Sequence, residues 1–337
     1  MASYVSLHTH SEYSLLDGLP KIKKLVSYAK EIGMTSLALT DHGVMYGAVE
    51  FYKECVAQKI RPIIGIEAYV VNRDHKMKES QAAKANNHLI LLAKNMEGYK
   101  NLMQLSTIAH LEGYYYRPRF DKATLKKYSD GLICTSSCPK GELAELLIGG
   151  DYKKAKEVAS WYNDVFGQGN YFLEIQRHQA RDFVEKARET SSRVADNLLE
   201  MQKNEDIWVS QTIKISRELG IPLVATNDAH YLRQTDAIAQ DALVCISTGK
   251  NVSDIERLRY VDVPTLHVRT NDEMEQIFPD VLEALENTTK IAEMVDLKID
   301  LGNWYFPNFE IPGGKTGPEY LTELALERFP NKYPEQK

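Results

Sequence analysis

Two histidines and an aspartate stand close together near the N-terminus, in the stretch HTHSEYSLLD. His8 and His10 are one residue apart and directly follow a short apolar run, and Asp17 lies a few positions further on. If the apolar run is a strand, alternation points both imidazoles to one face, where they can bind a single ion. The pair alone is weak evidence for a metal site, because two surface histidines at a strand end explain it more simply.

Further residues that can bind metal fall at or near the ends of other apolar runs. Imidazole, thiolate and carboxylate ligands together suit zinc, or manganese and iron where carboxylates and water dominate. A carboxylate such as Glu67 can bridge two ions, so two or three metals are expected rather than one. Clusters of this kind activate water for the hydrolysis of phosphate esters. These residues are Asp41, His42, Glu67, Cys138, Asp228 and His230.

Each of these residues also has a simpler interpretation. Asp41 and Asp228 could cap the helices that follow them, and Cys138 could be a buried apolar side chain, as is expected for Cys134. Their common placement at strand ends favours metal binding. The remaining histidines lack that placement and are expected to be surface or structural residues, although His178 lies just past a predicted strand. They are His75, His110, His178 and His267.

The elements that must position these residues alternate in type. Nearly continuous apolar runs predict strands covered on both faces, and the amphipathic stretches between them predict helices. Strand followed by helix, repeated about seven times, predicts an α/β fold with a parallel β/α barrel, in which the strand ends form one rim. Strands are predicted over 4–8, 36–42, 62–70, 88–94, 131–138, 171–176 and 222–230. Helices are predicted over 20–33, 48–58, 102–111, 153–167 and 182–219.

One connection differs from the others. Residues 71–87 are polar and rich in Lys, Asn and Gln, which is typical of a flexible loop rather than a packed crossover helix. The strand that starts at His88 is therefore expected to run antiparallel beside the strand that ends near Val70. No glycine-rich phosphate-binding motif opens any predicted helix.

Composition limits the class of protein. The 337 residues are 43% hydrophobic and 26% charged, as in soluble globular proteins with a substantial core. The net charge of −6 argues against bulk electrostatic binding of nucleic acid, without excluding a local basic groove. No apolar run is long enough to span a membrane and no signal peptide is found, so no membrane partner is expected. Four cysteines in so long a chain favour a reducing, cytoplasmic location.

The C-terminal part has a different character. Residues 1–270 are predicted to form the barrel, and residues 271–337 to form a helical and linker segment. Within it, LGNWYFPNFEIPGGKTGPEYL is rich in Pro and Gly, and 300–318 is predicted to be a linker. The segment is expected to be the start of a second domain that is cut off.

Several motifs carry a resemblance to a known family. HTHSEYSLLDG, TDHG, GIEAYV, HLILLAKN, LICTSSC and NDAHYL, in this order, resemble the polymerase and histidinol phosphatase (PHP) domain. The closer match is the version at the N-terminus of bacterial DNA polymerase III alpha subunits, to which NLMQLST, GYYYRPRF and DALVCISTGK are also similar. The resemblance implies a distorted seven-stranded (β/α)7 TIM-like barrel, the PHP fold, with 271–337 leading toward the polymerase palm.

The resemblance also implies a ligand set for up to three divalent ions, with zinc expected and manganese or iron as alternatives. It adds Asp17 and His88 to the residues above, and it makes Asp41 a residue that orients His42 or caps the next helix. One ion would be held by His8, His10, Glu67 and Asp228, a second by Glu67, His88 and Cys138, and a third by Asp17, His42 and His230.

The implied activity is 3′–5′ exonuclease proofreading of DNA by a multinuclear-metal phosphoesterase. Asp17, His42 and His230 would have the catalytic role of holding the ion nearest the attacking water. DNA polymerase activity would belong only to the full-length chain. The implied partners are the DNA primer 3′ end, the rest of the alpha subunit, and replisome subunits such as the sliding clamp or a separate proofreading subunit. Two alternatives stay open: a metal-stabilised structural or docking module without nuclease activity, and a small-molecule phosphatase of histidinol-phosphatase type.

Overall fold

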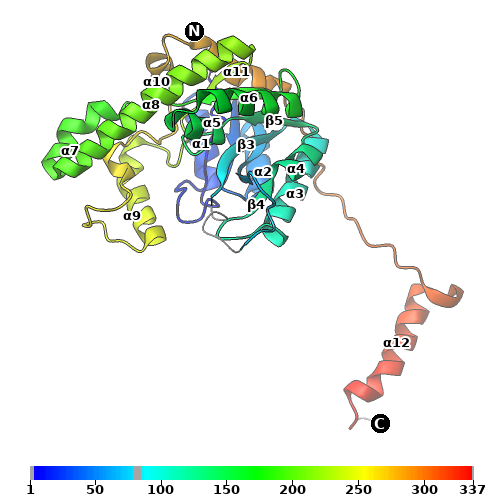
Figure 1. Cartoon of the computed structure of the whole chain (residues 1–337). Coiled ribbons are helices and arrows are strands. Elements are labelled where there is room, and N and C mark those ends of the chain that lie inside the picture. The colour runs from blue at the N-terminus through cyan, green and yellow to red at the C-terminus, as the bar shows by residue number, and fades with distance from the viewer. Residues whose placement is uncertain (1–3, 79–84, 336–337) are drawn as a thin grey trace. The chain divides into compact units, whose positions relative to one another are not determined.

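The computed structural model describes residues 4–78 and 85–335. The chain divides into two compact units, Met1–Ile299 and Asp300–Lys337. In the first unit, helices surround a curled sheet (Figure 1). The described strands are β1 (Ser36–Leu39), β2 (Arg61–Val71), β3 (Asn87–Ala93), β4 (Arg119–Asp121), β5 (Leu132–Thr135), β6 (Tyr171–Ile175) and β7 (Leu223–Ala225).

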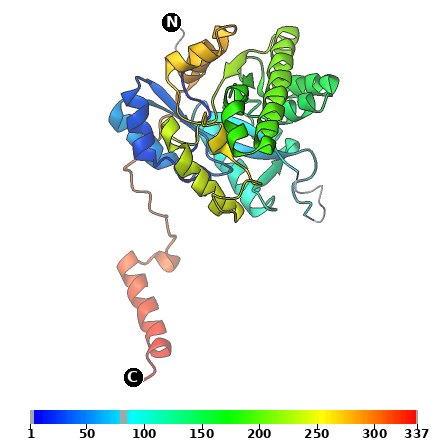
Figure 2. The same ribbon diagram turned by 90° about the vertical axis from the view of Figure 1, so that its left-hand side faces the viewer.

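The helices that cover this sheet follow its strands along the chain. They are α1 (Ile22–Glu31), α2 (Ala48–Gln58), α3 (Met96–Leu111), α4 (Lys122–Lys127), α5 (Glu142–Ile148), α6 (Tyr152–Phe166), α7 (Val184–Thr190), α8 (Ser192–Leu219), α9 (Ala237–Thr248), α10 (Asn271–Ile277) and α11 (Leu282–Met294). Short 3-10 helices occupy Ala180–Phe183, Gln234–Asp236 and Tyr260–Asp262. Figure 2 shows the same arrangement from the side.

The strand order is β1-β2-β3-β5-β6-β7, with β4 paired to β2. Strands pair in parallel except for β3, which is antiparallel to both β2 and β5. The predicted reversal at His88 is therefore confirmed, and it places His88 opposite Tyr69 of β2. Of the predicted loop over 71–87, residues 79–84 lie outside the described residues.

The first predicted strand, 4–8, is not a strand in the structure. This extended segment instead makes isolated backbone hydrogen bonds in two directions. Ala38 N in β1 donates to Ser6 O at 2.9 Å, and Ala229 N, after β7, donates to His8 O at 3.0 Å. The segment thus joins the two ends of the sheet and closes a distorted (β/α)7 barrel, as expected. The strand that the sequence did not predict is β4, which has three residues and too short a pattern to recognise.

Helix predictions were accurate where the apolar stripe is regular. The predicted helix 48–58 has the same bounds as α2. The predicted helix 182–219 is wrong as a single helix, because it breaks at Ser191. That residue is extended, and its hydroxyl accepts a hydrogen bond from Arg193 N, so it caps a new helix, α8.

The helices after residue 270 pack on the barrel. Thr288 of α11 accepts a hydrogen bond from Val5 N at 2.8 Å, and Asn287 donates to Leu223 O of β7 at 2.8 Å. Phe278 and Leu285 are fully buried. The compact unit therefore extends to Ile299, because the apolar faces of these helices complete its core. The assignment of separate functional domains to 1–270 and 271–337 stays a prediction.

The second unit, Asp300–Lys337, is described by itself. Residues 300–311 contain no helix or strand, which agrees with the predicted linker, and a short 3-10 helix, Pro312–Gly314, follows. The helix α12 (Gly317–Lys332) begins with a capping box between Thr316 and Glu319. Large apolar side chains of this unit, including Trp304, are exposed.

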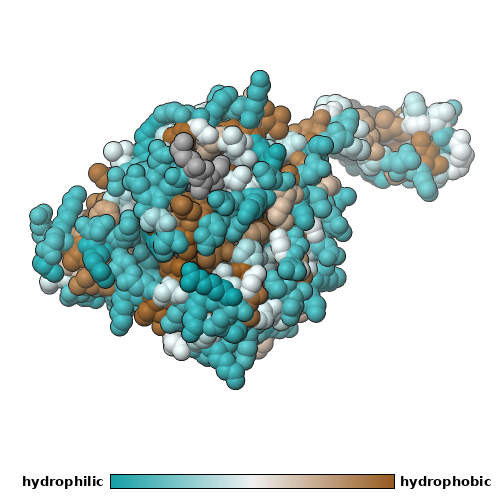
Figure 3. All heavy atoms as spheres, turned by 90° about the horizontal axis from the view of Figure 1, so that it is seen from above, coloured by the Kyte–Doolittle hydropathy of each residue, from teal (hydrophilic) through white to brown (hydrophobic). Residues whose placement is uncertain are grey.

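The surface agrees with the amphipathic patterns in the sequence. The face shown in Figure 3 is largely hydrophilic, with apolar patches between polar side chains. In the part of the chain that the structure describes, no helix has the length and apolar character needed to cross a bilayer.

Candidate metal centre

Glu67 lies at the centre of the candidate site. Its side chain is fully buried in the middle of β2, further from the strand end than predicted. Its Oε1 lies 2.7 Å from His88 Nδ1 and 3.3 Å from His8 Nε2. Its Oε2 lies 2.6 Å from His42 Nδ1 and 3.4 Å from His10 Nε2. One carboxylate therefore contacts four imidazoles, which is the arrangement expected of a bridging ligand.

Asp228 approaches His8 and His10 from a segment far downstream in the sequence. Its Oδ1 lies 3.1 Å from both His8 Nε2 and His10 Nε2. The predicted strand 222–230 is too long, since β7 ends at Ala225 and Asp228 has a left-handed φ of 50°. His230 Nδ1 donates to the Asp228 carbonyl at 2.8 Å, which leaves Nε2 as the atom able to bind a metal.

Asp17 brings a second pair of histidines, His42 and His230, together. Its Oδ2 lies 3.2 Å from His42 Nε2, and its Oδ1 lies 3.8 Å from His230 Nε2. The rings of His42 and His230 each lie 4.2 Å from that of His10, measured between centroids. The loop after the HTH motif therefore supplies a carboxylate to the cluster.

Cys138 and His88 meet where two strands of opposite direction reach the rim. Cys138 Sγ lies 3.6 Å from His88 Nδ1 and 3.6 Å from Glu67 Oε1. The predicted strand 131–138 ends early, because β5 stops at Thr135 and Ser137 has a φ of 65°. Since β3 is antiparallel, its first residues lie beside the last residues of its neighbours. His88 can therefore join the cluster from the start of a strand.

All nine predicted ligands thus lie together, and their orphaned atoms fit a cluster of divalent cations. Several of the close approaches lack hydrogen-bond geometry, so the atoms involved are buried without a hydrogen-bond partner among the described residues. Buried polar atoms of this kind are costly unless something else binds them, and a shared cation satisfies them all. The atoms are His8 Nε2, His10 Nε2, His42 Nδ1, Glu67 Oε2 and Asp228 Oδ1.

The electrostatics of the cluster agree with this fit. Burial alone would raise the pKa of Glu67, but the imidazoles of His88 and His42 hold it well below its usual value. Burial, with His42 and His230, lowers the pKa of His10 to about 3, which keeps it in the neutral form that binds metal. Burial raises the pKa of the Cys138 thiol, so a thiolate at this position requires a neighbouring cation.

Glu174 supports the cluster and was missed by sequence reasoning. Its Oε1 lies 2.8 Å from His8 Nδ1, and this carboxylate also accepts hydrogen bonds from Thr226 Oγ1 at 2.5 Å and Gln176 Nε2 at 2.9 Å. A carboxylate behind an imidazole fixes its tautomer and orientation toward a metal. The available signal was a glutamate inside the apolar run YFLEIQ, which forms a fully buried strand.

Asp41 acts through Ser14. Its Oδ1 accepts from Ser14 Oγ at 2.7 Å, and Ser14 Oγ in turn contacts His10 Nδ1 at 2.9 Å and accepts from His42 N at 3.1 Å. Through Ser14, Asp41 therefore reaches the ring of His10 but only the backbone of His42, so the expectation that it orients the His42 ring stays a prediction. The alternative that it caps the next helix is wrong, because Gly47 is the N-cap of α2.

The other histidines lie outside the cluster. His75 is buried and pairs with Asp121 at 2.7 Å, with Asp74 nearby. His110 contacts the Ser106 carbonyl. The expectation of a surface or structural role therefore holds for these two in its structural form.

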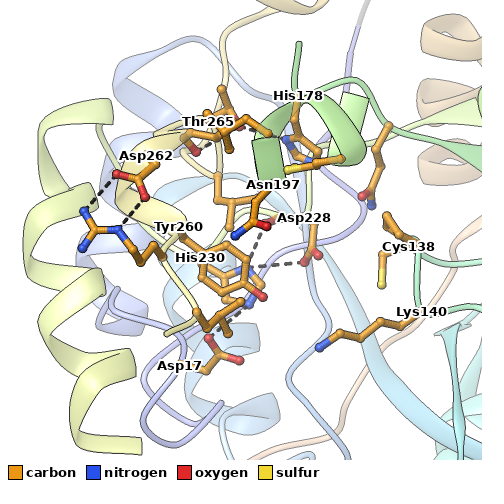
Figure 4. A pocket seen from close by; sticks show the side chains of 18 of the residues that line it. Asp17, Cys138, Lys140, His178, Asn197, Asp228, His230, Tyr260, Asp262 and Thr265 are labelled. Carbon is orange, nitrogen blue, oxygen red and sulfur yellow. Dashed lines mark hydrogen bonds and ion pairs between the residues drawn. The ribbon is translucent and has the colours of Figure 1, made fainter. Parts of the chain in front are cut away.

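His178 and His267 are also buried rather than on the surface. His267 pairs with Glu273 at 3.2 Å. His178 Nδ1 lies 2.9 Å from Thr265 Oγ1, and burial lowers the pKa of His178 to about 3. His178 also lines the cavity that opens over the cluster, which has a volume of about 380 Å³ (Figure 4).

Residues 6–178 match the model of the PHP domain. The chain belongs to the PHP domain family. Its curated relatives include the DNA polymerase III subunit alpha of Borreliella burgdorferi, 44% identical over 98% of this chain and 27% of the relative. The subunits of the same name from Treponema pallidum and Campylobacter jejuni are 42% and 41% identical, covering 97% and 92% of this chain and 26% and 24% of the relatives. This PHP domain chain therefore spans about a quarter of the length of these polymerase subunits.

Proposed function

We propose that this PHP domain hydrolyses phosphodiesters at DNA 3′ ends as a metal-dependent 3′–5′ exonuclease. The observation that carries the proposal is the convergence of nine metal-competent side chains, six of which line one cavity: Asp17, His42, His88, Cys138, Asp228 and His230. The sequence similarity to DNA polymerase III alpha subunits supports DNA as the substrate class.

The side chains divide into three groups for up to three divalent cations, with zinc expected from the imidazole and thiolate donors. Bound cations supply Lewis acidity, which lowers the pKa of water and neutralises phosphate charge. In the structure, the ligand atoms within each of three sets of residues lie within 4.8 Å of one another. The sets are His8, His10 and Asp228; His42, Glu67 and His88; and His10, His42 and His230.

Asp17 has the most direct access to substrate. Its side chain is 35% exposed, whereas those of His42 and His230 are 16% and 7% exposed and those of the other histidine pair are fully buried. Asp17 therefore lies where water and the scissile phosphate reach the cluster. With His42 and His230 it would hold the ion next to the attacking water.

The test is the Asp17→Asn variant in the chain of 337 residues. We expect loss of cleavage of a mismatched primer 3′ end, with an unchanged circular dichroism spectrum, because the amide keeps the shape of the side chain but is a poor ligand. Undiminished cleavage by the purified variant, with contaminating nucleases excluded by a second chromatographic step, would contradict the proposal.

The relatives set the wider context of the proposal. We propose that the natural partner in the same chain is the rest of a polymerase alpha subunit, and that the primer 3′ end is shared between the two activities. Contacts with a sliding clamp or a separate proofreading subunit, and a cytoplasmic location, belong to the same proposal. The four cysteines are free and buried, which agrees with a reducing compartment.

A structural role for the metals is the second candidate. It is favoured by the complete burial of His8, His10 and Glu67, whose unpartnered polar atoms would otherwise destabilise the barrel. A metal-stabilised docking module would melt at lower temperature on chelation but would have no nuclease activity to lose. Turnover of histidinol phosphate would instead identify a small-molecule phosphatase.

A further inference from the structure

The cavity above the cluster has two walls of different chemistry. One wall consists of metal-competent residues, and the other is largely apolar and has no part in binding metal. The second wall is formed by α8 and by the segment between α9 and α10. Its apolar side chains are Val194, Leu198, Met201, Ile255, Leu258 and Val263.

Tyr260 stands where the two walls meet. Figure 4 shows its ring over His230, between Asp17 and Asp228. Tyr260 is partly buried and packs against the small apolar cluster that contains Leu266. Its ring presents an aromatic face beside the cluster (Figure 4).

The basic side chains around the cavity differ in whether they are already paired with carboxylates. Arg257 makes a buried bidentate ion pair with Asp241, at 2.6 and 2.7 Å. Arg259 pairs in the same way with Asp262, at 2.6 and 3.0 Å. The apolar wall is therefore close to electrically neutral, and its arginines are held by their own carboxylates.

Lys140 lies on the opposite side of the cavity and is exposed. Its ammonium group makes no ion pair or hydrogen bond within residues 4–78 and 85–335. Figure 4 shows the side chain extending into the cavity below Cys138. Lys140 is thus a cation available to an anionic ligand on the metal side of the cavity.

We propose that the cavity binds one nucleotide with its base unstacked, the base against Tyr260 and the apolar wall and the phosphate between the cluster and Lys140. The inference rests on the proposed function and names the form of substrate that the site accepts. A volume of about 380 Å³ suits one small ligand and excludes a base pair within a duplex. Asn197, on the same wall, directs its amide into the cavity and offers a donor and an acceptor to a base edge (Figure 4).

This geometry should make the site prefer unpaired over paired 3′ ends, independently of the identity of the base. Aromatic and apolar surfaces stack with every base, whereas separating a base from its partner costs least at a mismatched or single-stranded end. Unpaired 3′ ends therefore enter the cavity more readily than paired ones.

The test compares two ligands that differ only by the base. Binding of thymidine 5′-monophosphate and of 2-deoxyribose 5-phosphate to the metal-loaded chain is measured by calorimetry. We expect the nucleotide to bind about tenfold more tightly, because only it can stack. Tyr260→Ala should remove most of this preference, and Met201→Ala, on a separate element, should reduce it. Tyr305→Ala is the matched control, since Tyr305 does not line the cavity.

A wild-type protein that binds the two ligands equally would overturn the proposal. So would a preference that survives in both Tyr260→Ala and Met201→Ala. Lys140→Gln should weaken both ligands by the same factor, because both carry the phosphate. A preserved preference for the nucleotide without any cleavage of DNA would contradict the proposed exonuclease function and leave the nucleotide pocket supported.

Discussion

At the scale of single residues, the site depends on carboxylates that serve several partners. Glu67 contacts four imidazoles, and Glu174 holds one of them, His8, from behind. The two glutamates differ in kind. Glu67 is placed to bind metal directly. Glu174 is a positioning residue, which is itself held by hydrogen bonds from Thr135, Gln176 and Thr226.

Replacing Glu174 by glutamine should weaken metal binding without removing a ligand. The amide no longer favours the His8 tautomer that directs Nε2 toward the cluster, and losses of this kind are ~10–100-fold in metal affinity. Competition with a chelator of known affinity measures the change. Glu286→Gln, at an exposed position of α11, is the control. Equal affinities of the two variants would show that Glu174 does not orient His8.

The ligands differ in how far they could be predicted from sequence. His8, His10, Glu67 and Cys138 follow from residue type and from their positions at or near apolar runs. Asp17 came only from the family motif, because nothing in a polar loop says that it folds back onto His42. Glu174 could not be identified as a partner of His8, since the two are 166 positions apart and meet only once the barrel closes.

At the scale of elements, several strands are shorter than their apolar runs predict, including β5 and β7. The backbone turns into left-handed conformations at Ser137 and Asp228, just after β5 and β7. Such conformations are costly for residues other than glycine and are concentrated at functional sites. Loops that follow the strands, rather than the strands themselves, therefore direct Cys138, Asp228 and His230 to the cluster.

A left-handed residue far from the cluster provides a test of this cost. Lys59 ends α2 with a φ of 61° and is exposed. Lys59→Gly should raise the free energy of unfolding by about 0.5–1 kcal/mol, because glycine has no Cβ to strain there. Lys53→Gly, in the middle of the same helix, should lower it by about 1 kcal/mol. Urea denaturation measures both, and a loss of stability in Lys59→Gly would contradict the explanation.

Whether a segment is a helix or a strand was more predictable than its exact bounds and its hydrogen-bonding neighbours. The antiparallel β3 was expected because the polar segment before it cannot form a crossover helix. The segment 4–8 has the apolar pattern of a strand without forming one, because such a pattern does not reveal how many backbone hydrogen bonds the residues make. The break at Ser191 was missed because the apolar stripe continues through it, from Val184 to Val194.

At the scale of the whole molecule, the metals should contribute to folding stability. A cation present at one hundred times its dissociation constant adds ~2.7 kcal/mol to the free energy of unfolding. Chelation should therefore lower the melting temperature by about 5 °C or more for a barrel of this size. Differential scanning calorimetry with and without a chelator measures the shift.

The control for this effect is Glu67→Gln, which loses the ligand shared by most of the cluster. Chelation should change its melting temperature little, because few ions remain to be removed. A shift as large as that of the wild type would mean that the metals stabilise the chain at some other place.

The segment 4–8, which closes the barrel, also affects when the cluster can form during synthesis of the chain. The backbone hydrogen bond from Ala229 N to His8 O, and the contact of His8 with Asp228 in the cluster, join the beginning of the chain to a part that is synthesised much later. At ~5–20 residues per second, roughly ten seconds or more separate the emergence of these two segments from the ribosome. During that interval the nascent chain contains His8 and His10 but not yet Asp228, the carboxylate that contacts both. The complete set of metal ligands therefore forms late in synthesis, after most of the barrel has been made.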